Sequence, residues 1–137
     1  MSQMPEVKAP TEVRDGMRIT WQQPIPADDG IVLRADVFRP IEDGHYPVIL
    51  SYGVYAKGLA FQEGYPLQWE KMISDYPQIL QGSTNKYQNW ETTDPERWVP
   101  HGYAIVRVDS RGAGARDFSC KIRSGPARDR VCAPPSR

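Results

Sequence analysis

The sequence has no net charge, no long apolar run and no secretory leader, and each absence removes a class of protein. Lysine plus arginine and aspartate plus glutamate both number 17, so the formal net charge is +0. A balanced charge gives no general attraction to nucleic acid or to an anionic membrane. No apolar stretch approaches the roughly 20 residues that a membrane span needs, and residues 1–11 contain no signal-peptide core. We therefore expect a cytoplasmic protein with neither a nucleic-acid nor a membrane partner.

Signals for a metal or an organic cofactor are equally scarce. The two cysteines, Cys120 and Cys132, have no further framework for a disulfide, and no histidine near them completes a zinc pattern. The run Gly112-Ala113-Gly114 begins like a dinucleotide-binding loop, but no third glycine follows at the required spacing. We expect no cofactor and no metal.

Turn-forming residues are abundant, and the chain divides into three parts. It has 13 prolines and 11 glycines in 137 residues, with a mean hydropathy of -0.60. The length suits one domain of ordinary size. We expect a flexible N-terminus over residues 1–14, an α/β domain over residues 15–115, and a disordered arginine-rich tail over residues 116–137, where no hydrophobic period survives.

The first part of the domain predicts an antiparallel hairpin over residues 15–39. Apolar residues alternate with polar ones in two runs, and the apolar positions are Met17, Ile19, Trp21, Leu33, Ala35 and Val37. A period of two places this set on a core and the residues between them, such as Arg34 and Asp36, toward water. Residues 24–30 supply the turn.

The second part predicts a parallel strand–helix–strand unit. Residues 48–50 read as a strand covered on both faces, and residues 104–108 as the next strand. Between them, five apolar residues recur at helical spacing: Tyr65, Trp69, Met72, Ile73 and Tyr76. Pro66 suits the first turn of that helix and Pro77 ends it. The order favours a right-handed βαβ crossover.

The rest of the crossover predicts a polar surface loop over residues 81–95. Asp94 is suited to cap a short helix that follows it. Trp69, Trp90 and Trp98 could line a pocket, but aromatic residues at these spacings are more often core.

A polar, glycine-containing turn follows the last predicted strand, which is where ligands gather in open α/β sheets. We expect Asp109 to accept backbone N–H bonds from that turn. For Lys57 an exposed position is the expectation, and pairing with a carboxylate near the site is the alternative.

Several segments, in order, resemble the start of the CocE/NonD family of α/β hydrolases, relatives of the S15-type X-Pro dipeptidyl peptidases and of cocaine esterase. Gly53-Val54-Tyr55-Ala56-Lys57 resembles the Pro-Tyr-x-Lys loop of the family, and residues 108–114 resemble its Asp-x-Arg-Gly-x-Gly turn. Further matching segments are residues 15–17, 33–40, 46–50, 90–91, 94–96 and 98–104. The resemblance covers residues 15–114 and implies the N-terminal portion of an α/β-hydrolase sheet, incomplete: an antiparallel hairpin followed by a βαβ unit.

The resemblance implies acyl transfer by a serine, histidine and aspartate triad, with the serine on a Gly-x-Ser-x-Gly elbow. The paired glycines are missing at Ser51, Ser74, Ser83, Ser110, Ser119 and Ser124. Ser110 comes closest, but Val108 stands where the first glycine belongs, so we assign it to a structural turn. His45 and His101 occupy turn and loop positions, and the family's catalytic histidine lies much later.

The resemblance leaves one catalytic candidate, Tyr55, as the donor to the oxyanion. A phenol with a pKa near 10 stays protonated at neutral pH and donates without ionising. One such donor is typically worth about 3 kcal/mol in the transition state. The alternative is an aromatic ring packed at the base of a loop.

We therefore expect the N-terminal fragment of a serine hydrolase that acts on ester or amide bonds, acyl or X-Pro dipeptidyl, and that is inactive as it stands. The substrate of the intact enzyme would be a small-molecule ester or a peptide. A non-catalytic binding or interaction fragment is the alternative, and a nucleotide-binding βαβ domain is a distant third. The arginine-rich residues after 115 depart from the family and suggest a frameshift or truncation there. An unpaired sheet edge and an uncovered apolar face would make the chain poorly soluble.

Overall fold

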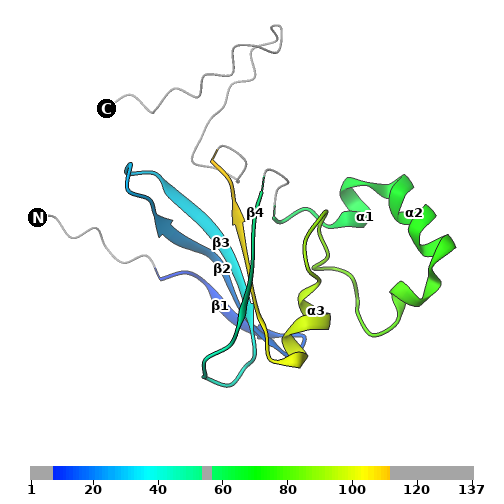
Figure 1. The fold of residues 1–137 in the computed structure, drawn as a ribbon, viewed down its shortest axis with the longest axis horizontal. Coiled ribbons are helices and arrows are strands. Elements are labelled where there is room, and N and C mark those ends of the chain that lie inside the picture. Colours follow the sequence, from blue (N-terminus) through cyan, green and yellow to red (C-terminus); the bar gives the residue numbers. More distant parts are fainter. Residues whose placement is uncertain (1–7, 54–56, 112–137) are drawn as a thin grey trace, which may run out of the picture.

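A five-stranded mixed sheet with a helical crossover on one side forms the fold (Figure 1). The computed structural model describes residues 8–53 and 57–111. The strands are β1 (Thr11–Arg14), β2 (Met17–Pro26), β3 (Val32–Arg39), β4 (Val48–Gly53) and β5 (Ala104–Asp109). Their order in the sheet is β1-β2-β3-β5-β4, and the β4–β5 pair is parallel while the other pairs are antiparallel.

The predicted hairpin is present as β2 and β3, and β1 lengthens it. The expected flexible N-terminus, residues 1–14, contains β1 at its end, while residues 1–7 lie outside the described residues. Strand β2 continues through Pro24 and Pro26 to pair with β3, so part of the predicted turn is strand. Prolines are tolerated there because β1 pairs only with residues 17–20, which leaves the outer side of β2 unpaired at the prolines.

The buried face of β3 differs from the predicted one. Asp36, expected to face water, is only 2% exposed, and Phe38 is buried two residues later. Of the three apolar positions predicted to be buried, Ala35 is fully buried, and Leu33 and Val37 are half-buried. The reason is topological: β3 is an interior strand between β2 and β5, and its Asp36–Phe38 face lies beneath the crossover. The alternating pattern predicted the strand correctly but not which face is buried more deeply.

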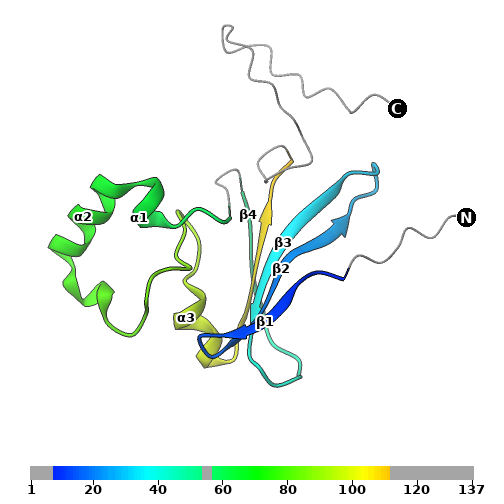
Figure 2. The same ribbon diagram turned by 180° about the vertical axis from the view of Figure 1, so that it is seen from behind.

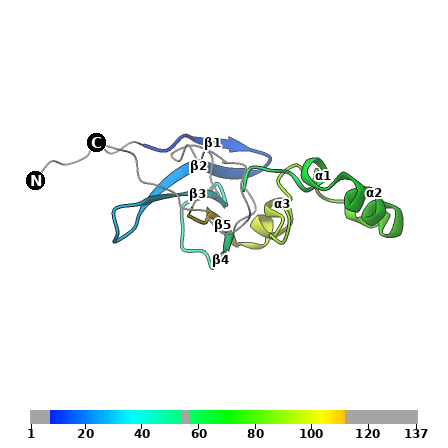
Figure 3. The same ribbon diagram turned by 90° about the horizontal axis from the view of Figure 1, so that it is seen from above.

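Strand β4 corrects a second expectation, because it is not covered on both faces. It lies at the sheet edge, and the residues Val48, Leu50 and Tyr52 are 56%, 62% and 55% exposed. Figures 1 and 2 show the helices of the described chain on one side of the sheet, and Figure 3 shows the same from above. The opposite face of β4 is therefore open to solvent.

The crossover from β4 to β5 contains three short helices and two 3-10 turns. They are α1 (Phe61–Gly64), α2 (Pro66–Asp75), η1 (Pro77–Leu80), α3 (Pro95–Trp98) and η2 (Val99–His101). As predicted, α2 begins at Pro66 and ends before Pro77, and the Asp94 side chain caps α3 by accepting the N–H of Glu96 at 3.1 Å. None of the described helices is long and apolar enough to cross a bilayer.

The predicted surface loop, residues 81–95, is partly internal instead. Asn85, Tyr87, Asn89 and Asp94 are buried in it. Tyr87 enters the main core, and its ring centroid lies 5.5 Å from that of Phe38. Polar composition predicted a loop, but Tyr87 packs against the sheet, and Asn85, Asn89 and Asp94 bond to other residues of the crossover.

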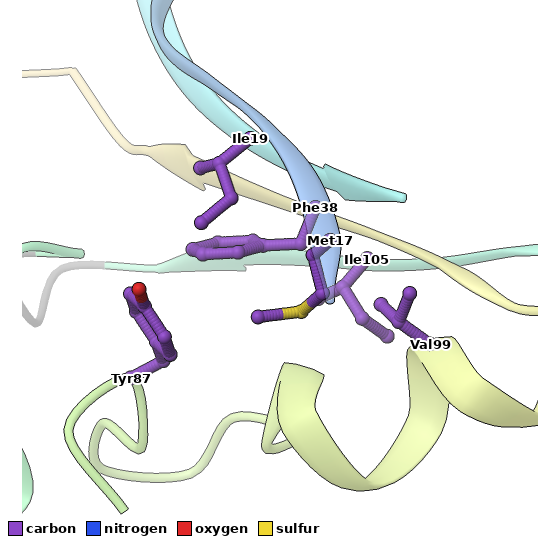
Figure 4. Packing of buried hydrophobic residues seen from close by; sticks show 6 residues of the cluster. All are labelled: Met17, Ile19, Phe38, Tyr87, Val99 and Ile105. Atoms are coloured by element: carbon purple, nitrogen blue, oxygen red, sulfur yellow. The ribbon is translucent and has the colours of Figure 1, made fainter. Parts of the chain in front are cut away.

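The hydrophobic core lies between the sheet and the crossover (Figure 4). Its buried members are Met17, Ile19, Phe38, Tyr87, Val99 and Ile105. The Tyr87 hydroxyl donates to Asp15 Oδ2 at 2.5 Å, and burial, followed by this bond, raises the pKa of the phenol. This core holds β5 and the loop over residues 81–95 against β3. It thereby positions the end of the sheet at which β4 and β5 terminate.

Candidate functional site

Polar and charged residues gather at the C-terminal ends of β4 and β5. Gly53 ends β4 and Asp109 ends β5, and the two strands run parallel, so both reach the same edge of the sheet. The N–H of Ser110 donates to the carbonyl of Gly53 at 2.9 Å, which ties the two strand ends together. In open α/β sheets this edge is where binding groups are placed.

A buried lysine lies at this edge between two buried carboxylates. Lys57 Nζ is 3.3 Å from Asp109 Oδ2 and 3.4 Å from Asp36 Oδ1. The side chains of all three residues are 3–6% exposed. The expectation of an exposed lysine is therefore wrong, and the alternative, pairing with carboxylates, is confirmed. We call these three residues the Lys57 cluster.

Backbone hydrogen bonds hold the Lys57 cluster in place. Asp109 Oδ1 accepts the N–H of Lys57 at 2.9 Å, and Asp36 Oδ1 accepts the N–H of Gln22 at 2.9 Å. Asn89 Nδ2 donates to the carbonyl of Lys57. Asp109 thus accepts a backbone N–H, as predicted, but from Lys57; the Gly112–Gly114 turn for which the role was predicted lies outside the described residues.

A second buried cation, Arg107, lies behind the cluster on β5. Its Nη2 donates to the carbonyl of Thr93 at 2.7 Å, and its guanidinium lies 5.3 Å from the ring centroid of Phe38. Burial lowers the pKa of Arg107 to about 10, against the raising effect of the charges of Asp94 and Asp36. Arg107 therefore stays cationic at neutral pH and offsets the excess negative charge of the cluster.

A hollow of about 250 Å³ lies beside the cluster, over β4 and β5. Its lining includes Lys57, Arg107, Trp90 and residues 51–53 of β4. Glu91, which also lines it, has a φ of 55°, a backbone conformation that is uncommon outside glycine and is found at functional sites. The hollow therefore combines an aromatic wall with two buried cations.

The three tryptophans considered as pocket residues, Trp69, Trp90 and Trp98, differ in what they contact. Trp69 and Trp90 pack on Phe61, with ring centroids 6.0 Å and 5.2 Å away, and Trp90 also faces the hollow. Trp98 is 41% exposed and packs edge-on against Tyr103. Trp69 and Trp90 are half-buried and lie outside the main core, so the core expectation is wrong for all three.

The proposed oxyanion donor, Tyr55, lies outside the described residues. Ser110 follows β5 directly, and its Oγ is buried with no hydrogen-bond partner among the described residues. His45 and His101 are exposed, and both precede the strands that end at the site. They lie at the opposite end of β4 and β5 from Ser110, so neither histidine pairs with Ser110.

Sequence reasoning missed Asp36 as a site residue. The available signal was a carboxylate in the middle of a strand, between the apolar residues Ala35 and Val37. A charge in that position is costly to bury unless it is paired. Lys57, the partner, is 21 residues further along the chain (57 minus 36) and follows a different strand.

Comparison with known proteins shows which family of proteins this chain resembles. The family model described as X-Pro dipeptidyl-peptidase (S15 family) matches residues 29–118. Two crystal structures of a CocE/NonD family hydrolase from Staphylococcus aureus are similar, both at 28% sequence identity and with TM-scores of 0.50 and 0.53. No curated protein matches the sequence.

The structural match covers most of this chain but only a small part of each Staphylococcus aureus chain. The two structures are matched over 67% and 75% of this chain but over only 15% and 19% of their own chains. The match to the family model runs through β3, β4 and β5 and includes Asp36, Lys57 and Asp109. Because that match covers well over half of its residues, the chain belongs to the X-Pro dipeptidyl-peptidase (S15) family.

Proposed function

We propose that this chain carries the oxyanion-stabilising side of a serine hydrolase that cleaves ester or amide bonds. The single observation that carries the proposal is the Lys57 cluster at the C-terminal edge of β4 and β5. Lys57 is the last residue of the segment that resembles the family's Pro-Tyr-x-Lys loop, and Tyr55 lies two residues before it. The segment is thus attached to the edge where an α/β sheet places its reacting groups.

The role proposed for Tyr55 is to donate its hydroxyl to the negative charge that develops on the carbonyl oxygen of the substrate. A neutral phenol donates without losing its proton at pH 7. The sequence contains no Gly-x-Ser-x-Gly elbow, so the proposed contribution is the donor and not the nucleophile. The substrate class is a small-molecule ester or a peptide.

Two measurements test the proposal. A fluorophosphonate probe should leave the 137-residue chain unlabelled, and a covalent label on any serine would show a nucleophile that the sequence does not predict. In a full-length family member with a tyrosine at the position of Tyr55, the change to phenylalanine should lower kcat by about 100-fold, the effect of losing one oxyanion donor. Unchanged turnover there would remove the role of Tyr55.

A non-catalytic interaction function is the second candidate. The observation that favours it is the exposed apolar row of Val48, Leu50 and Tyr52 on edge strand β4. The strand carries no charged residue and no proline, which are the usual features that prevent edge pairing. The partner would be a second copy of this chain, because two such edges can pair with each other.

A further inference from the structure

We propose that two copies of this chain pair through β4, antiparallel and about a two-fold axis that passes Leu50, so that their two sheets join into one. This inference rests on the second proposed function, an interaction between copies, and gives that interaction its geometry. The strand, Val48–Gly53, lies wholly within the described residues. The pairing surface is the exposed apolar row of Val48, Leu50 and Tyr52.

The backbone hydrogen-bonding groups of the exposed apolar row point away from the rest of the sheet. The carbonyls of Pro47 and Gly53 accept N–H groups from the start of β5 and from the residue after it, both at 2.9 Å. Successive residues of a strand direct these groups to alternate sides, so the odd-numbered residues of β4 face β5. Val48, Leu50 and Tyr52 therefore direct their N–H and C=O groups outward. Figure 3 shows β4 beyond β5, on the side of the sheet away from β1.

The side chains of the exposed apolar row share one face of β4. Burial alternates along the strand, with the three residues of the row exposed by more than half and Ile49 and Ser51 between them half-buried. Residues directly opposite each other in an antiparallel pair present their side chains on the same face. Pairing with a second copy therefore continues the apolar surface of the first copy across the junction.

The exposed apolar row is symmetric about Leu50, and this symmetry sets the register. Hydrogen bonding in an antiparallel pair requires outward-pointing residues to lie opposite one another. With Leu50 opposite Leu50 of the second copy, Val48 lies opposite Tyr52, and all three outward residues of each copy bond across the junction. A shift of two residues leaves one outward residue of each copy with no residue of β4 opposite it. The centred register thus satisfies the most backbone groups.

Charge favours a second copy as the partner. The strand carries no charged residue and the chain has a net charge of +0, so two copies meet without like-charge repulsion. The opposite edge strand, β1, carries Glu12 and Arg14, charges of the kind that prevent edge pairing. Each copy has one β4 edge, so the assembly closes at two. Because a standard interface has about 20–30 residues a side, pairing through one short strand should be weak and depend on concentration.

Disulfide trapping tests the register. Leu50→Cys, in a chain that also carries Cys120→Ser and Cys132→Ser, should form a covalent dimer on oxidation, seen on a non-reducing gel. The opposing Cα atoms of a hydrogen-bonded antiparallel pair are about 5.5 Å apart, which a disulfide spans. Val48→Cys alone should not form this dimer, because its two copies lie about 13 Å apart along the strands. An equimolar mixture of Val48→Cys and Tyr52→Cys should form it.

Leu67→Cys on α2 is the matched control, because Leu67 is 75% exposed and lies away from β4. At equal concentration and oxidation time it should give about 10-fold less covalent dimer than Leu50→Cys, since only random collisions bring its thiols together. Equal yields from the two variants would overturn the inference. So would a dimer from a mixture of Val48→Cys and Leu50→Cys but none from Leu50→Cys alone, which would show a shifted register.

Amide hydrogen exchange tests the pairing in the unaltered chain. The outward-pointing Leu50 amide should exchange at least about fivefold more slowly at high than at low protein concentration, because a second copy accepts its hydrogen bond. The Ile49 amide, which already faces β5, is the internal control and should exchange at one rate. Leu50→Lys should abolish the concentration dependence at residue 50. A Leu50 amide whose exchange does not depend on concentration would overturn the inference.

Analytical ultracentrifugation separates failure of this inference from failure of the proposed interaction function. Association that rises with concentration, but without the Leu50 cross-link and without protection of the Leu50 amide, would refute pairing through β4 and leave an interaction through another surface. A chain that stays monomeric throughout would refute both.

Discussion

The hydroxyl of Tyr87 connects two distant parts of the chain. It donates to Asp15, in the turn between β1 and β2, and the ammonium of Lys86 lies 2.6 Å from the same carboxylate oxygen. These bonds, that of Lys86 first, lower the pKa of Asp15, while burial and the Asp15 bond raise the pKa of Tyr87. The lowered pKa of Asp15 makes the stability of the fold depend on pH in the acidic range, and the raised pKa of Tyr87 makes it depend on pH in the alkaline range.

The raised pKa of Tyr87 predicts how the stability of the fold changes at alkaline pH. An unfolded tyrosine ionises near its ordinary pKa of 10.0, whereas folded Tyr87 keeps its proton to higher pH. The stability that this shift contributes is complete below pH 10 and is lost as the pH rises through the folded pKa. The free energy of unfolding should fall above pH 10, by up to about 1.4 kcal/mol per pH unit for one proton.

Urea denaturation at pH 9, 10 and 11 measures this fall, and Tyr87→Phe is the control. The phenylalanine variant should show a shallower decline between pH 10 and 11, because it has no phenol to ionise in the core. Identical slopes for the two proteins would contradict the assignment of the shift to Tyr87.

At the residue scale, the sequence predicted the types of group at the site better than their surroundings. Asp109 was expected to accept backbone N–H bonds from the glycine turn after β5; the glycines of that turn lie outside the described residues, and the bond that is present comes from Lys57. Lys57 and Asp36 were expected to face water, and both are buried. Their ion pairs join Lys57, in the crossover after β4, to Asp36 of β3 and Asp109 of β5, and no local pattern carries that information.

At the element scale, boundaries set by backbone chemistry could be predicted. Pro66 and Pro77 delimit α2, and Asp94 caps α3, because each effect depends on neighbouring residues alone. The edge position of β4 could not be predicted, since an apolar run predicts a strand but not its place in the sheet. Burial of Tyr87 likewise depends on β2 and β3, which lie far away in the sequence.

Gly102 gives a prediction for the turn that leads into β5. It ends η2 with a φ of 81°, and its N–H donates to the carbonyl of Val99 at 3.0 Å. No atom lies within 4 Å of the place where a Cβ would be, so strain and not collision decides the effect. Gly102→Ala should therefore lower the free energy of unfolding by about 1 kcal/mol.

Chemical denaturation of Gly102→Ala beside Gly58→Ala provides the comparison. A Cβ at Gly58 also meets nothing within 4 Å, and Gly58 is not among the glycines with positive φ. Gly58→Ala should leave stability within about 0.5 kcal/mol of the parent chain. Equal losses in the two variants would show that the backbone conformation of Gly102 is not the cause.

At the scale of the whole molecule, the open face and edge of β4 predict self-association. Leu50 is central in the exposed row and 62% exposed. Leu50→Lys places a charge on this row, which is how natural edge strands avoid pairing. The parent chain should form dimers or larger species as its concentration rises, and the variant should remain monomeric over the same range.

Analytical ultracentrifugation across a concentration series measures this difference. Leu67→Lys is the matched control, because Leu67 is 75% exposed on α2 and lies away from the β4 edge. It should associate as the parent does. A parent chain that is monomeric throughout, or equal rescue by both lysines, would exclude β4 as the contact.

The position of β5 between β3 and β4 also has a consequence for the order of assembly. Five residues separate β2 from β3 (32 − 26 − 1), whereas 50 separate β4 from β5 (104 − 53 − 1). A tenfold longer loop costs about 2 kcal/mol more in closure entropy. We therefore expect the hairpin to form before β5 inserts between β3 and β4. Until that insertion β4 has no neighbour in the sheet, so slower insertion should lengthen the time for which newly made chains are exposed to misassembly.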